Sequence, residues 1–99
     1  MELKFVEEND AVTVFLSGKI DSETAPDIET ELKEILKKTN TLFIDMSEVI
    51  YISSAGLRII LASYKYLKTK SGNMIIKNAN EDVRQIFTIT GLIDVFNFE

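Results

Sequence analysis

Cysteine, histidine and tryptophan are absent from this chain of 99 residues. Without cysteine there are no thiolate nucleophiles and no disulfides, and without histidine there is no imidazole to act as an acid or base near neutral pH. These two residue types also supply most zinc ligands. We therefore expect no metal site, no cofactor and no catalytic residue, and we do not expect an enzyme.

Long apolar runs and clustered positive charge are also missing. No apolar stretch approaches the roughly 20 residues of a membrane-spanning helix, and residues 1–4 lack the basic region and apolar run of a signal peptide. The expected compartment is therefore the cytoplasm. Eleven basic residues against sixteen acidic ones give a formal net charge of −5, and the longest basic cluster is Lys65, Lys68 and Lys70. Nucleic acid is therefore not an expected partner.

What the chain does contain is the composition of one small globular domain over residues 1–99, with 45% hydrophobic and 27% charged residues. Apolar and polar residues alternate on both sides of the turn-like segment EENDA, residues 7–11, which predicts a β-hairpin. Phe15 falls on the opposite face from Val12, Val14 and Leu16 in this pattern. It marks either an exposed apolar patch or, as we expect, a side chain that the last strand covers.

After the hairpin, helical and strand-like segments alternate. Apolar spacings of three and four predict helices that begin near Ala25, Ser54 and Asn80, and short apolar runs at 42–44, 73–77 and 94–98 predict strands. The run 42–44 is typical of a strand that is buried on both faces. Because helices inserted between strands require right-handed crossovers, we predict an α/β fold: a single small domain with a mixed, mostly parallel sheet, an N-terminal hairpin and βα repeats.

Two loops of this predicted fold carry polar side chains at the carboxyl ends of strands, where α/β proteins tend to bind ligands and partners. The segment GKIDSETA, residues 18–25, carries Asp21 and Ser22, and SEVIYISSAG, residues 47–56, carries Ser53 and Ser54. Both loops are expected to open at the same end of the sheet. Ser53 is the natural cap of a helix that starts at Ser54, and Asp21 or Ser22 can cap the helix that begins near Ala25. A capping role also remains open for Ser54.

Three segments of the chain, GKIDSETA, FIDMSEV and YISSAGLRIILASYK, resemble the STAS domain of bacterial anti-sigma factor antagonists in their order and separation. The resemblance covers nearly the whole chain. It implies that Ser54 is phosphorylated by an anti-sigma factor with serine kinase activity, and that a serine phosphatase reverses the modification. The unmodified form would bind the anti-sigma factor and so free a sigma factor. By the same resemblance, Asp21 matches an acidic residue beside the phosphorylation site, and Asp45 matches the aspartate that closes the third strand.

The best-studied members of that family read Asp-Ser-(Ser/Thr)-Gly at this point, whereas this chain has Ser53 in place of the aspartate and Ala55 in place of the second hydroxyl. Ser54 is therefore the first candidate for phosphorylation and Ser53 the second. Gly56 lacks a side chain, which would let a partner approach closely, and Arg58 lies on the exposed face of the predicted helix. The predicted partner-binding residues are Asp21, Ser22, Ser53, Ser54, Gly56 and Arg58.

A phosphate at the amino end of a helix meets unpaired backbone amides and a partial positive charge, so we expect phosphorylation to leave the backbone largely unchanged. The alternative function is a STAS domain that is never phosphorylated and serves as an assembly subunit of a transporter or a signalling complex. A nucleotide-binding or enzymatic role is disfavoured, because the chain has no glycine-rich phosphate loop and no metal-ligand cluster. We expect a monomer, with weak dimerisation through the hairpin edge left open.

Overall fold

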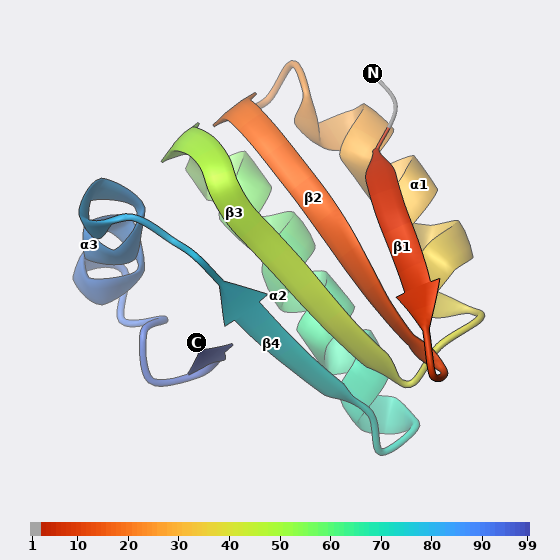
Figure 1. Cartoon of the computed structure of the whole chain (residues 1–99). Coiled ribbons are helices and arrows are strands. Elements are labelled where there is room, and N and C mark those ends of the chain that lie inside the picture. Colours follow the sequence, from red (N-terminus) through yellow and green to blue (C-terminus); the bar gives the residue numbers. More distant parts are fainter. Residues whose placement is uncertain (1–2) are drawn as a thin grey trace.

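The computed structural model describes residues 3–99, in which five strands form one sheet and three helices connect them (Figure 1). The strands are β1 (Lys4–Glu8), β2 (Ala11–Ile20), β3 (Thr41–Ile52), β4 (Asn73–Lys77) and β5 (Asn97–Phe98), and the helices are α1 (Ala25–Leu36), α2 (Ser54–Thr69) and α3 (Glu81–Ile89). β1 is antiparallel to β2, and the other neighbouring strands are parallel. The predicted fold class and the predicted order of elements are confirmed.

The sheet is covered by α1 and α2 on one face, and the opposite face of β1 to β4 is open. The strands follow one another across the sheet in chain order. Successive right-handed crossovers that move in the same direction place their helices on the same side, and α1 and α2 both lie behind the sheet in Figure 1. The prediction that residues 42–44 are buried on both faces is therefore wrong. Leu42 and Ile44 are fully buried, but Phe43 between them is only half-buried.

Phe15 lies on the open face and is 39% exposed. Its neighbours across the sheet are Lys4 on β1 and Asp45 on β3, whereas β5 lies at the other edge, beside β4. The expectation that the last strand covers Phe15 is therefore wrong. Phe15 is therefore an exposed aromatic side chain on the open face, with a charged residue on each neighbouring strand.

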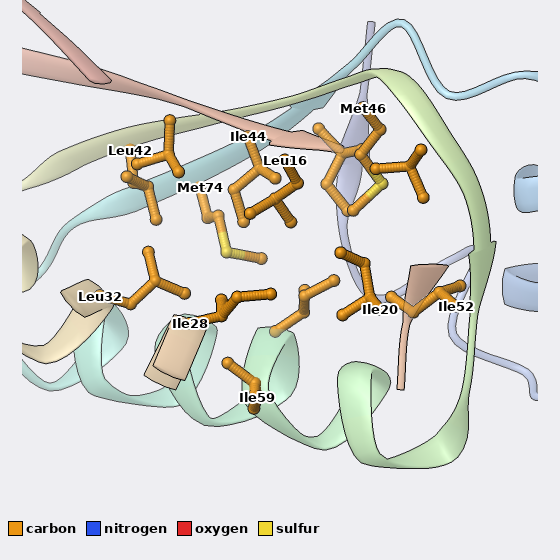
Figure 2. Packing of buried hydrophobic residues seen from close by; sticks show 14 of the residues in the cluster. Leu16, Ile20, Ile28, Leu32, Leu42, Ile44, Met46, Ile52, Ile59 and Met74 are labelled. Carbon is orange, nitrogen blue, oxygen red and sulfur yellow. The ribbon is translucent and has the colours of Figure 1, made fainter. Parts of the chain in front are cut away.

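The core fills the space between the sheet and the helices, as Figure 2 shows. Side chains of β2, β3 and β4 there face α1 and α2, and the labelled members are Leu16, Ile20, Ile28, Leu32, Leu42, Ile44, Met46, Ile52, Ile59 and Met74. The apolar residues whose spacing of three and four predicts the first helix are all buried in α1: Ala25, Ile28, Leu32, Ile35 and Leu36. The spacing of apolar residues thus identified the correct face of this helix.

The third strand is longer than the sequence indicated. β3 continues to Ile52, so most of the predicted loop 47–56 is a strand, and β2 likewise continues through the first part of the predicted loop 18–25. The register between β2 and β3 shifts after Phe15 and again after Gly18, and each shift inserts one extra residue into β3. These insertions interrupt the alternation of apolar and polar residues, which hid the second half of the strand.

The first turn of α2 packs directly on the ends of β2 and β3. A Cβ atom at Gly56 would lie 2.7 Å from Cγ2 of Ile20 and 2.8 Å from Cγ1 of Ile52, well inside the separation at which carbon atoms attract one another. Gly56 is buried, and the space that a side chain would need is filled by the core. The glycine therefore has an internal packing role, in contrast to the partner approach that the sequence suggested.

We expect Gly56→Ala to lower the free energy of unfolding by about 1–3 kcal/mol, because the added methyl group overpacks the core. The higher helix propensity of alanine offsets only part of this loss. Urea unfolding monitored by circular dichroism measures the change. Ser54→Ala, at an exposed position of the same turn, is the control and should change the stability by less than about 0.5 kcal/mol. An unchanged unfolding midpoint for Gly56→Ala would contradict the close packing of α2 on the two strands.

Candidate functional site

The two polar segments identified in the sequence meet at one end of the sheet. The backbone amide of Ser53 donates a hydrogen bond to the carbonyl oxygen of Ile20 at 2.8 Å, and Asp21 directly follows Ile20. The loop of residues 21–24 therefore lies beside the junction of β3 and α2, at the upper ends of β2 and β3 in Figure 1. The prediction that both segments open at the same end of the sheet is confirmed.

Ser53 is the N-cap residue of α2. Its backbone is extended, with φ −91° and ψ 176°, and its Oγ accepts a hydrogen bond from the amide of Gly56 at 3.4 Å. Its carbonyl oxygen accepts the first helical hydrogen bond, from the amide of Leu57 at 2.9 Å. The half-buried hydroxyl of Ser53 thus accepts a hydrogen bond from one of the amides that have no acceptor within the helix.

Ser54 is the first residue of α2, and its side chain is exposed. Arg58, one helical turn later, is exposed as well, and residues four apart lie on the same face of a helix. The first turn contains no acidic side chain, and the helix dipole gives this end a partial positive charge. The start of α2 itself therefore favours an added negative charge at Ser54, while Asp21 on the neighbouring loop acts against it.

Asp21 caps the turn that leads into α1, one of the roles that the sequence left open for it. Its carbonyl oxygen accepts a hydrogen bond from the amide of Ala25 at 2.8 Å, and its own amide donates one to Oγ1 of Thr24 at 3.0 Å. Thr24, directly before α1, makes no side-chain capping hydrogen bond to the helix. Asp21 is half-buried, and its Oδ1 accepts hydrogen bonds from the amides of Glu23 at 2.9 Å and Thr24 at 3.2 Å. Its carboxylate therefore holds the loop next to Ser53 in shape, while Ser22 is exposed on the same loop.

The family resemblance placed Asp45 at the end of the third strand, whereas the structure places it within β3. Its Oδ1 accepts a hydrogen bond from the amide of Ser47, and its Oδ2 accepts one from Nδ2 of Asn78, both at 2.9 Å. Partial burial acts to raise the pKa of Asp45, but the hydrogen bonds from Ser47 and Asn78 and the charge of Lys77 outweigh it and hold the pKa below its usual range. This carboxylate therefore joins β3 to the segment that follows β4.

Sequence reasoning missed two exposed apolar side chains beside the start of α2. Ile50 is 63% exposed and Tyr51 is 48% exposed. Tyr51 is opposite Lys19 of β2, whereas Ile50 is the extra residue at the second register shift. Such bulges often re-aim side chains near functional sites. Their exposure is hard to foresee from the sequence, because residues 49–52 form an ordinary apolar run.

The sequence that forms this sheet and site matches a known family. The family model described as STAS domain matches residues 2–99. The chain belongs to the STAS domain family. This STAS domain is 31% identical to the Anti-sigma-B factor antagonist of Bacillus subtilis (strain 168) over 90 residues, which are 91% of this chain and 82% of that protein.

Solved structures agree with this assignment. An anti-sigma factor antagonist from Mycobacterium paratuberculosis is 28% identical and superposes with a TM-score of 0.87, covering 98% of this STAS domain and 83% of that chain. The anti-sigma factor antagonist SpoIIAA in its unphosphorylated form is 18% identical, with a TM-score of 0.84, and the match covers 99% of this chain and 88% of SpoIIAA. At that level of identity, the likeness to SpoIIAA concerns the fold alone.

Within residues 3–99 of this STAS domain, none of the helices combines the length and apolar composition needed to cross a membrane. In the same part of the chain, acidic side chains do not come together in groups of three or more that could hold a metal ion.

The two serines should differ in their effect on stability. We expect Ser53→Ala to lower the free energy of unfolding by about 1 kcal/mol, because a helix-capping hydrogen bond is lost. Ser53→Asp should retain the stability, since aspartate caps helices as well as serine does. Urea unfolding of both variants, with Ser54→Ala as the exposed neighbour, measures the difference. Equal losses for Ser53→Ala and Ser54→Ala would contradict the assignment of Ser53 as the cap.

The lowered pKa of Asp45 predicts a pH-dependent stability. Because the folded state favours the ionised carboxylate, Asp45 contributes stability that is present above its unfolded pKa of about 3.9 and is lost as the pH falls through the lower folded-state pKa. We therefore expect Asp45→Asn to be less stable than the wild type at pH 7, with a difference that shrinks below about pH 4. Urea unfolding at a series of pH values tests this, and a difference independent of pH would refute it.

Proposed function

We propose that this STAS domain is an anti-sigma factor antagonist, a binding regulator and not an enzyme, which is switched by phosphorylation of Ser54. In the unphosphorylated form it binds an anti-sigma factor with serine kinase activity and so frees a sigma factor, and a serine phosphatase restores this form. The observation that carries the proposal is the exposed Ser54 at the first position of α2. The names of the relatives that match more than nine-tenths of the chain support the class of partner.

The assignment of Ser54 over Ser53 rests on their different environments. The hydroxyl of Ser53 is half-buried and engaged with the amide of Gly56, so a phosphate there would disturb the start of α2. Ser54 is exposed, and a phosphate on it would replace only contacts with water. Ser53 occupies the place of the aspartate in the family pattern, and because both residues cap helices well, the exchange keeps the capping function.

The switch acts through charge. A phosphoryl group adds a charge of about −1.5 to −2 and three acceptor oxygens where there had been a small neutral hydroxyl. A change from 99% to 1% of molecules able to bind the partner requires about 5.5 kcal/mol. An uncompensated charge buried in an interface costs several kcal/mol. A single modification therefore supplies most of what a switch requires, while the amides at the helix start and Arg58 keep the modified domain folded.

The partner-binding surface that we propose surrounds Ser54 and is mixed in character. Asp21, Ser22 and Arg58 provide polar and charged groups, and the exposed side chains of Ile50 and Tyr51 provide an apolar area at the end of β3. Large exposed apolar side chains commonly form the centre of protein interfaces. Gly56 contributes indirectly, because its packing positions Ser54.

The test uses the anti-sigma factor kinase of the same organism with ATP. Mass spectrometry locates the phosphate, which we expect on Ser54, and calorimetry measures binding of the kinase to the wild type, Ser54→Ala and Ser54→Asp. Ser54→Ala should bind as the wild type does, and Ser54→Asp should bind at least roughly 100-fold more weakly, because it buries an uncompensated charge.

Ser71→Asp is the matched control, because it places the same new charge at an exposed position just beyond the opposite end of α2. It should bind as the wild type does. Equal binding by Ser54→Ala and Ser54→Asp would exclude the switch and favour an assembly subunit, and a phosphate found on Ser53 would correct the site.

A further inference from the structure

β1 is an edge strand whose outer side faces no other strand within the described residues. It pairs with β2 alone, and all five of its residues, Lys4–Glu8, are exposed. In Figure 1 its right-hand side has no strand beside it. The backbone groups of such an edge can form a ladder with another strand.

The centre of this edge strand is apolar on both faces. Phe5 is 46% exposed and is opposite the buried Val14, which places Phe5 on the helix side of the sheet. Val6 is 48% exposed and is opposite Thr13, which places it on the open side. Edge strands of monomers are commonly protected by a central charge, a proline or a covering segment. β1 instead carries its charges towards its two ends.

We propose that β1 pairs with β1 of a second copy of this chain, in a symmetric antiparallel ladder centred on Val6. A two-fold axis perpendicular to the sheet keeps the helices of both copies on the same face, so residues that share a face must lie opposite one another. The register centred on Val6 is the one that pairs all five residues of β1. It places Lys4 opposite Glu8 of the second copy, Phe5 opposite Glu7, and Val6 opposite Val6.

On the open face, this register places opposite charges against each other, and on the helix side it separates the two Glu7 carboxylates to diagonal positions. On the open face, two Lys4–Glu8 pairs flank the central pair of Val6 side chains. The neighbouring register centred on Glu7 would place that carboxylate against its own copy, and like charges directly opposite each other are destabilising. The register centred on Phe5 would place Lys4 opposite Val6 and leave the lysine without a carboxylate across the ladder.

Apolar contacts would fill the centre of the interface on both faces. On the helix side, the two copies of Phe5 are diagonal neighbours across the axis, a separation that aromatic side chains can bridge. On the open side, Val6 begins a row that continues through Thr13 and Phe43 to Ile75. Pairing of the two edges joins the rows of both copies into one continuous apolar stripe.

The expected dimer is weak and leaves the candidate phosphorylation site free. Ladders of five residues bury less surface than the roughly 1,200–2,000 Å² of stable complexes, so association should depend strongly on concentration. The start of α2 lies behind the upper end of β3, and β2 separates β3 from the β1 edge (Figure 1). Ser54→Asp should therefore dimerise as the wild type does, which separates this proposal from the proposed switch.

Sedimentation velocity over concentrations from about 10 μM to about 1 mM tests the dimer, and we expect dimer to accumulate towards the upper end. Lys4→Glu and Glu8→Lys each convert both cross-strand pairs to like charges and should weaken dimerisation roughly tenfold. The double variant Lys4→Glu/Glu8→Lys restores opposite charges and should dimerise as the wild type does. Lys65→Glu, on the exposed face of α2, makes the same change of net charge as Lys4→Glu and should have little effect.

A second measurement on the wild type does not depend on the folding of any variant. Amide chemical shifts recorded during dilution should change for residues 4–8. A chain that stays monomeric at all these concentrations would overturn the proposal, and so would a dimer that both single charge reversals leave intact. Changes centred on Phe15, Phe43 and Ile75 would also overturn it, because they would indicate packing of the open faces and not pairing of the edges.

Discussion

The contact on which the candidate site depends is the close packing of the first turn of α2 on the ends of β2 and β3. It is possible because Gly56 has no side chain where Ile20 and Ile52 fill the space. This contact, together with the hydrogen bond from Ser53 to Ile20, fixes where the helix begins. It turns the hydroxyl of Ser53 towards the helix and leaves Ser54 facing solvent. A shift of one residue in this start would exchange the roles of the two serines.

The order of the strands decides which face of the sheet is covered and where the candidate site and the β1 edge lie. Because the chain crosses the sheet in one direction, α1 and α2 cover one face and leave the other open. The carboxyl ends of β2 and β3 then hold the residues around Ser54, and the β1 edge lies apart from them. The proposed regulator-binding surface and the proposed dimerisation edge can therefore coexist on a chain of 99 residues.

The proposed switch acts through charge and shape. The helix dipole and Arg58 reduce the cost of a phosphate for the folded domain, whereas a partner fitted to a neutral hydroxyl would have to bury that charge. The bulge in β3 adds Ile50 and Tyr51 as apolar contacts next to the switch. In the proposed switch, the same modification is tolerated by the fold and unfavourable for the complex.

The sequence by itself determined the order of elements, the hairpin, the buried stripe of α1 and the meeting of the two polar segments, because these follow from spacings within one helix or strand and from the handedness of crossovers. Only the tertiary structure decided that Phe15 is exposed, that β3 extends to Ile52 and that Gly56 packs inward, whereas the capping role of Ser53 followed from its place before the predicted helix. The physical reason is that apolar periodicity reports neighbours a few residues apart. Register shifts, the covered face of a sheet and the room beside a glycine are set by contacts between residues that are distant in the chain.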